Sequence, residues 1–163
     1  MGIIARFYPD IAQETQVQRL KRWCFDNLSD QTSNNKEIEN TTAQGYLSCL
    51  DSLIYRKDIV LIPKNSQDSE KLFNILVKIW ITTNNASRSA TPIAALALFY
   101  HHARLFSNLL LPNSEKLYDC LYSWAHHHNP SVCKHGLHTF EEFIKEVWWY
   151  IIIDISSSNK ALM

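Results

Sequence analysis

Apolar residues recur along most of the chain at spacings of three and four, which is the period of an amphipathic α-helix. Polar stretches separate these segments, and capping residues or prolines mark several of their ends. The pattern predicts an all-α fold, a single compact bundle of about six helices. These begin after Asp10, at Thr41 or Thr42, after Ser66 or Asp68, at Ile93, at Asn113 or Ser114, and at Thr139.

The segment 93–110 is predicted to be the central helix of this bundle. It is apolar through eight consecutive residues, and a helix that is apolar on all sides is usually buried. Thr91 and Pro92 provide a helix start, and Pro112 ends the segment. Two short apolar runs, 3–8 and 59–62, could add a minor two-stranded extended pair near the N-terminus.

The last predicted helix begins with a capping box of the Thr-x-x-Glu kind at 139–142. The intervals between its successive apolar residues are mostly three positions and one position in turn, as expected for an amphipathic helix. The domain is predicted to comprise residues 1–155, followed by a polar tail at 156–163. The inward stripe is Phe140, Phe143, Ile144, Val147, Trp148, Ile151, Ile152 and Ile155.

Composition and charge narrow the class of protein. The chain has 163 residues, of which 46% are apolar, enough for one domain with its own core. Sixteen basic residues balance sixteen acidic ones, which argues against a general nucleic-acid binder. No run reaches the roughly 20 apolar residues of a membrane span, and the first residues do not resemble a signal peptide. The sequence therefore favours a cytoplasmic protein that is not inserted in a membrane.

Five of the seven histidines lie between positions 126 and 138, in a segment predicted to be a helix end and a loop. Imidazole and thiolate groups bind zinc, so this segment is a candidate zinc site. The spacing matches no standard zinc motif, and the helix dipole also favours histidine in a last turn. A solvated or hydrogen-bonded loop without any cofactor is therefore the alternative. The candidate metal ligands are His127, Cys133, His135 and His138, with Cys120 as an alternate.

Two further residues have both a structural and a functional interpretation. His102 shares a helical face with Leu98 and Leu105, so we expect it to be partly buried, either as a hydrogen-bonded core residue or as a catalytic base. Trp23 is flanked by basic residues, which could indicate base stacking. Its place on the apolar stripe of the first helix favours a core position instead.

No residue pattern identifies a reaction site, which favours a protein without enzymatic activity. The chain contains only three glycines, so it lacks a glycine-rich phosphate loop. Trp149 and Tyr150 are expected on the outer or flanking face of the last helix, and such residues are enriched at interface hot spots. We therefore predict a helical protein that binds another protein, such as a stoichiometric inhibitor or an immunity protein that neutralises a toxin.

The alternative function is a metal-binding protein or a metal-dependent hydrolase that uses the His/Cys cluster at 120–138. A third hypothesis is pH sensing, since the clustered histidines would gain charge together below about pH 6.5.

Overall fold

The computed structural model describes residues 14–33, 40–56, 58–83 and 90–161. This part of the chain contains helices and their connections and no strand, which confirms the all-α prediction. The helices are α2 (Glu14–Ser33), α3 (Asn40–Ile54), α4 (Gln67–Thr82), α5 (Ala90–His102), the 3-10 helix η2 (Ala103–Phe106), α6 (Ser107–Leu110), α7 (Ser114–Ala125) and α8 (Pro130–Ala161).

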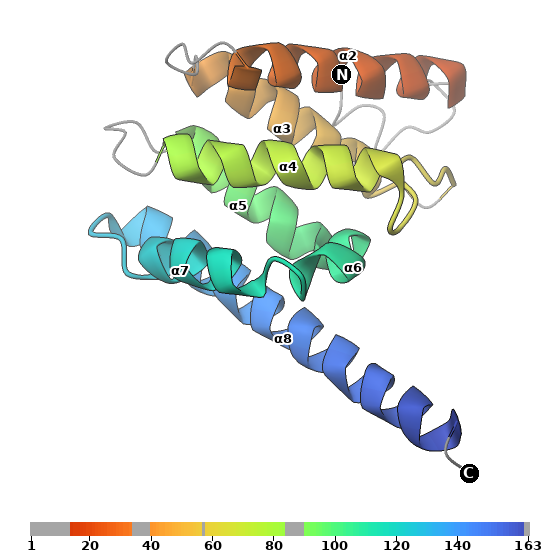
Figure 1. Ribbon diagram of the computed structural model, residues 1–163. Coiled ribbons are helices and arrows are strands. Elements are labelled where there is room, and N and C mark those ends of the chain that lie inside the picture. Colours follow the sequence, from red (N-terminus) through yellow and green to blue (C-terminus); the bar gives the residue numbers. More distant parts are fainter. Residues whose placement is uncertain (1–13, 34–39, 57, 84–89, 162–163) are drawn as a thin grey trace.

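The helices form three pairs that stack on one another (Figure 1). Within the pairs, α2 packs on α3, α4 on α5, and α7 on α8. Between the pairs, α2, α4 and α7 follow one another in one layer, and α3, α5 and α8 follow one another in the other. Each pair therefore contacts mainly its neighbours in the stack, as in helical repeat architectures.

The core lies between the two layers and is rich in aromatic residues. Trp80 meets Phe99 edge-on at 5.5 Å between ring centroids, and Phe99 stacks on Phe106 at the same distance. All three side chains are fully buried. Burial of this kind is the main favourable contribution to folding, and edge-on or offset ring packing adds to it.

The segment 93–110 is largely buried, as predicted, but it does not form one continuous helix. It breaks after α5 because His102 leaves helical geometry, with φ −130° and ψ 27°. The break is stabilised by Asn65, whose backbone N–H donates to the Leu105 carbonyl at 3.1 Å. The Asn65 side-chain oxygen also accepts from the Ser107 hydroxyl and the Asn108 N–H, both at 3.3 Å. A distant loop thus supplies the partners that a continuous helix would have provided.

The predicted strand at 59–62 is also wrong: these residues form bends and an irregular segment. Leu61 and Ile62 are each 3% exposed, so the apolar run serves the core as part of a loop. The Leu61 carbonyl accepts a hydrogen bond from the Lys21 ammonium at 3.1 Å instead of from a neighbouring strand. The proposed partner run, 3–8, lies outside the described residues.

Helix α8 begins nine residues before the predicted start at Thr139. Its first turn is capped by Asn129, whose side-chain oxygen accepts from the N–H of Ser131 at 3.0 Å, with Pro130 in the first helical position. Thr139 is an interior residue whose hydroxyl contacts the carbonyls of His135 and Leu96. The helix also continues to Ala161, through part of the segment predicted as a polar tail.

Candidate interaction surface

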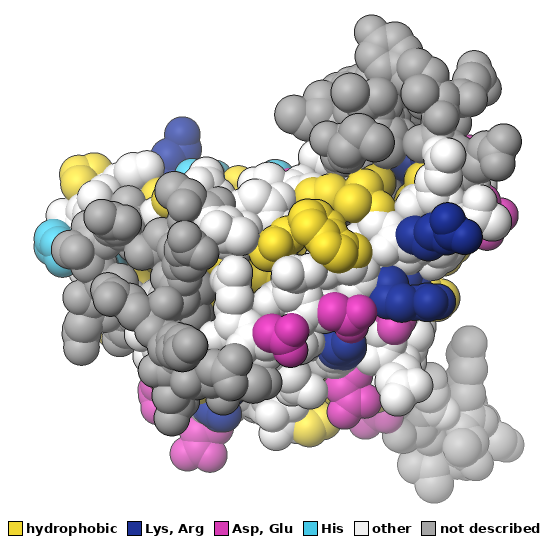
Figure 2. All heavy atoms as spheres, turned by 90° about the horizontal axis from the view of Figure 1, so that it is seen from above, with side chains coloured by type: hydrophobic (Ala, Val, Ile, Leu, Met, Phe, Trp, Pro, Cys, Tyr) yellow, Lys and Arg dark blue, Asp and Glu magenta, His cyan; other side chains and the backbone are white. Residues whose placement is uncertain are grey.

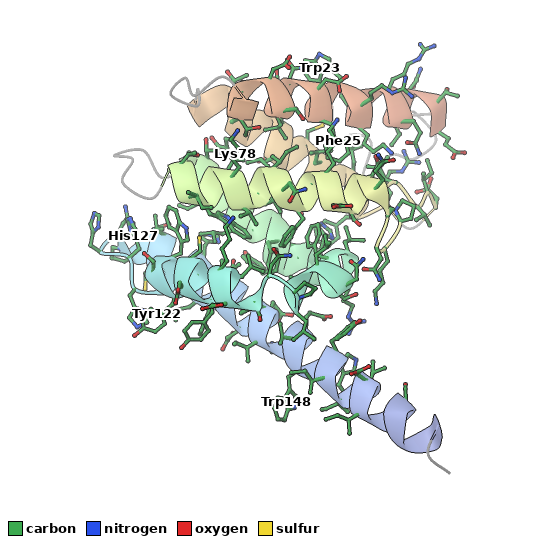
Figure 3. The ribbon with its side chains drawn as sticks, in the orientation of Figure 1. Trp23, Phe25, Lys78, Tyr122, His127 and Trp148 are labelled. Atoms are coloured by element: carbon green, nitrogen blue, oxygen red, sulfur yellow. The ribbon has the colours of Figure 1, made fainter. Side chains whose placement is uncertain are left out.

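The lowest pair of the stack, α7 and α8, carries exposed apolar side chains on the side away from the other pairs. Figure 3 shows Tyr122 and Trp148 pointing outward from this side. We call this surface the end face. Its exposed members are Tyr118 and Tyr122 of α7 and Leu137, Ile144 and Trp148 of α8, and the half-buried Phe140 lies between them.

Aromatic contacts join the two helices across the end face. Tyr118 stacks on Tyr122 at 6.0 Å between ring centroids. Phe140 of α8 meets Tyr118 edge-on at 5.4 Å and Tyr122 at 6.3 Å. The rings therefore form one continuous patch that spans both helices.

The end face continues along α8 beyond the rest of the stack, where the helix projects away from the other elements (Figure 1). Leu137, Ile144, Trp148 and Ile155 are separated by seven, four and seven residues, which places them on one side of a helix. Trp148 is 64% exposed and Ile155 is 56% exposed. No helix within the described residues is long and apolar enough to cross a membrane.

The inward stripe predicted for this helix is only partly correct. Phe143 is buried, and Phe140 and Val147 pack against the core. Ile144 and Trp148 face solvent instead. The predicted stripe spans about half of the helix circumference, because its residues alternate between steps of three and one. Only one edge of so wide a stripe packs on α5 and α7, and the other edge forms the end face.

The two residues predicted as interface anchors are exposed. Trp149 is 59% exposed and Tyr150 is 40% exposed, both on the projecting part of α8. Their role in binding stays a prediction. Trp23, by contrast, is not the core residue that its pattern suggested, since it is 53% exposed on α2. It points away from the stack in Figure 3 and packs edge-on against Tyr46 at 4.9 Å.

The four candidate metal ligands do not come together. His127, at the end of α7, stacks on Trp124, and its Nδ1 accepts from the Asn129 N–H at 3.1 Å. The Cys133 thiol donates to the Ala125 carbonyl at 3.1 Å. The earlier start of α8 explains the difference, because it fixes the predicted loop ligands on a rigid helix.

His135 and His138 lie near Tyr100 of α5, at 6.0 and 5.7 Å between ring centroids. In the part of the chain that the structure covers, no three His, Cys, Asp or Glu side chains are placed to hold a metal ion. The pKa of His135 lies below its usual value because burial, followed by the charges of His138, Lys134 and His101, disfavours the imidazolium. Hydrogen bonds and aromatic contacts therefore hold these histidines and Cys133, and the four side chains do not form an assembled ligand set.

His102 is partly buried, as predicted, and forms a hydrogen-bonded group with Asp51 of α3. Its Nε2 lies 2.8 Å from one Asp51 carboxylate oxygen, and His101 Nδ1 lies 3.1 Å from both oxygens. The carboxylate can only accept, so both imidazoles donate. Burial raises the Asp51 pKa, but the hydrogen bond from His102 and the neighbouring His101 outweigh it and lower the pKa overall. The group fixes α3 to α5.

Sequence reasoning missed the α7 part of the end face. Tyr118 and Tyr122 are four residues apart, about 100° round the helix from the buried Leu117 and Leu121. This second apolar stripe was visible in the sequence. A helix with two separate apolar stripes can contact two different neighbours.

The described residues thus define a class of protein: an all-helical stack of helix pairs with an open apolar end face. The model of the family described as "DNA-PKcs, N-terminal" matches residues 1–163. The chain therefore belongs to this family.

Curated relatives support the same assignment. The chain is 26% identical over 164 residues to the DNA-dependent protein kinase catalytic subunit of Canis lupus familiaris. It is 23% identical over 147 residues to that of Gallus gallus and 23% identical over 164 residues to that of Mus musculus. These alignments cover 99%, 90% and 99% of this chain. The chain spans about 4% of the length of each relative.

The family match corrects the function predicted from the sequence. An immunity protein or toxin inhibitor was wrong, and so was the alternative of a metal-dependent hydrolase, because the whole chain matches the N-terminal region of a kinase subunit. The absence of familiar motifs had been interpreted as a sign of a small inhibitor. It is equally typical of a helical segment that serves a larger protein.

Proposed function

We propose that this chain is a non-catalytic scaffold segment whose end face packs against a further helix pair of the same, longer polypeptide. The observation that carries the proposal is the exposed apolar patch shared by α7 and α8 at one end of the stack. The family assignment supports it, since the matched relatives are many times longer than this chain.

The stacking within the chain indicates which kind of occupant fits. Helices α4 and α5 each pack on the preceding pair with one face and on the α7/α8 pair with the other. Helices α7 and α8 have the same two apolar faces, but only one of them is covered within the described residues. In stacked helical architectures such a face is covered by the next unit or by a polar capping repeat. An added helix pair would repeat the packing that already exists twice.

Charge favours a protein occupant over a nucleic acid. Between residues 147 and 157 the helix carries a single charged side chain, Asp154. On the preceding turns, Lys145 is paired with Glu142 at 2.7 Å, and Glu146 lies 3.5 Å from Arg104. A nearly neutral, aromatic surface suits an apolar helix face and offers no basic groups to a phosphate backbone.

Site-specific photo-cross-linking tests this proposal in the native host. A photoreactive phenylalanine analogue replaces Trp148, and the cross-linked peptides are identified by mass spectrometry. The expected product joins this site to a peptide from another helical segment of the same polypeptide. The matched control carries the analogue at Ile81 of α4, which is 51% exposed but lies outside the end face, and should give no such product.

Three outcomes would count against the proposal. A cross-link from position 148 to a different protein would show that the face serves an external partner. A cross-link to lipid or nucleic acid would assign the face to another class of ligand. Equal labelling from positions 148 and 81 would show that the end face has no specific occupant.

A further inference from the structure

The outer side of the first helix pair carries tryptophan, tyrosine and arginine together, the residue types that are enriched in binding hot spots. Trp23 is exposed on α2 and packs edge-on against the half-buried Tyr46 of α3, at 4.9 Å between ring centroids (Figure 3). Arg19 and Arg22 are exposed on the same side of α2, because residues three and four positions apart are neighbours on a helix. We call these four residues the α2 patch.

The two arginines of the α2 patch are unpaired, whereas the neighbouring cations are engaged. Lys21 of α2 pairs with Asp68 of α4 at 2.5 Å. Asp26, one turn after Arg22, pairs with Lys71 of α4 at 3.7 Å. Among the residues that the structure describes, no carboxylate lies within ion-pair distance of either patch arginine. Two exposed guanidinium groups are therefore available to bind carboxylates of another molecule.

Helix stability does not explain the order of charges along the exposed stripe of α2. Two arginines, Arg19 and Arg22, precede Trp23, and two acids, Asp26 and Asp30, follow it. Like charges three or four residues apart destabilise a helix. The helix dipole favours basic residues in the last turn, but α2 has Asp30 there and no basic residue. Recognition of a charged partner accounts for an arrangement that the helix itself does not favour.

We propose that the α2 patch docks an acidic segment of a separate partner protein. Carboxylates of this segment would pair with Arg19 and Arg22, whose planar guanidinium groups can each donate two parallel hydrogen bonds to a carboxylate. An apolar side chain of the same segment would cover the rings of Trp23 and Tyr46. The partner is therefore defined by its chemistry: acidic residues next to an apolar one.

The character of the patch favours a separate protein over a further helix pair of the stack. Successive pairs of this chain are joined by a core of buried apolar side chains. An apolar face of that kind would bury Arg19 and Arg22 without a counter-charge, which is strongly unfavourable. Interfaces between separate proteins combine an apolar centre with a polar rim. The α2 patch has this composition, because its aromatic rings lie beside two cations.

Charge favours carboxylates over the phosphates of a nucleic acid. Asp26 and Asp30 lie on the same exposed stripe as the arginines and would repel a phosphate backbone. Figure 2, which looks onto this end of the stack, shows both basic and acidic side chains near the hydrophobic ones. Charges of both signs on one stripe would also fix the direction in which a charged segment binds.

Carbodiimide cross-linking in an extract of the native host tests the proposal. In the single variants Arg19→Lys and Arg22→Lys the positive charge remains, the other arginine is kept, and the new amine can be joined to a carboxylate in contact with it. The cross-linked peptides are identified by mass spectrometry. The expected product joins position 19 or 22 to an Asp or Glu of a different polypeptide. Adding Trp23→Ala should lower its yield by about tenfold, a typical loss at a hot spot.

Lys116 provides the internal control, since it is an exposed amine of α7 outside the patch and should not give this product. Equal yields from Lys116 and the patch positions would overturn the proposal, and so would the absence of any product at positions 19 and 22. A link to another part of the same polypeptide would make the patch a contact within the chain. A single-stranded oligonucleotide that binds the wild type but not Arg19→Glu/Arg22→Glu would assign the patch to nucleic acid instead.

Discussion

At the scale of single residues, the Asp51 carboxylate accepts hydrogen bonds from two adjacent histidines. His102 is its nearer partner at 2.8 Å, and Tyr55 meets the His102 ring edge-on at 4.8 Å between centroids. The group joins α3 to α5 in the middle of the stack, between elements that are distant in sequence. Sequence reasoning predicted the partial burial of His102 but could not find its partner, because Asp51 is 51 residues away.

Replacing Asp51 with Asn should lower the free energy of unfolding by about 1 kcal/mol at neutral pH. This value is modest because solvent screens the charge of a partly exposed carboxylate. The folded-state pKa of Asp51 is below its ordinary value of 3.8. A depressed carboxyl pKa stabilises the fold fully above the ordinary pKa, and this contribution disappears as the pH falls through the folded-state pKa. The stability difference between wild type and Asp51→Asn should therefore shrink below about pH 4.

Denaturant unfolding of both proteins from neutral to acidic pH measures this difference. Glu115, an exposed acid of α7, provides the control through Glu115→Gln. That variant should differ little from wild type at any pH. A constant difference for Asp51→Asn across the whole range would mean that its charge does not contribute.

At the scale of elements, the crossing of α7 and α8 depends on the absence of a side chain at Gly136. A Cβ placed there would lie 2.3 Å from the Trp124 carbonyl oxygen and 2.8 Å from the Ala125 nitrogen, both backbone atoms. Because backbone cannot rotate aside, the helices would have to separate. Helix α8 begins at Pro130, earlier than predicted, and this earlier start places Gly136 at the crossing.

Gly136→Ala should destabilise the protein by about 1–3 kcal/mol, the usual cost of overpacking. Gly45→Ala is the matched control, because no atom lies within 4 Å of its added Cβ and the position is within α3. That variant should stabilise the protein by about 0.5–1 kcal/mol, since alanine favours helix. Thermal or denaturant unfolding measures both. Equal effects of the two substitutions would contradict the close crossing.

Helix periods were easy to predict from the sequence, and helix ends were not. The apolar stripes of α2, α4 and α7 located these helices because side-chain spacing is a local property. The start of α8 was misplaced because the Asn129–Pro130 pair is compatible both with ending one helix and with capping the next. The break after His102 depends on Asn65, a residue of a distant loop, and no local pattern records such a contact.

At the scale of the whole molecule, the three helix pairs stack in order, and the face that ends the stack remains apolar (Figures 1 and 3). The opposite end, seen in Figure 2, is more mixed: hydrophobic side chains lie among basic and acidic ones. The exposed Trp23 and the half-buried Tyr46 lie on the first pair, where Arg19 and Arg22 are also exposed. The two ends of the described stack therefore differ in character, and the α7/α8 end is the more apolar surface.

The candidate surface could be predicted only in part from the sequence. Exposure of Trp149 and Tyr150 followed from helical geometry, since adjacent residues point about 100° apart. The assignment of Trp148 and Ile144 to the core was wrong, because the width of an apolar stripe does not reveal whether one or two neighbours cover it. That information lies in the order in which the helices stack.

Amide hydrogen exchange along α8 tests whether another helix pair covers the end face. The rates are measured for the isolated chain and for the protein purified from its native source, with residues 132–143 as the internal reference. If a further helix pair covers the end face, residues 148–157 should exchange fast in the isolated chain and slowly in the native protein, because unpacked helix opens locally. Equally fast exchange of residues 148–157 in both samples would contradict it.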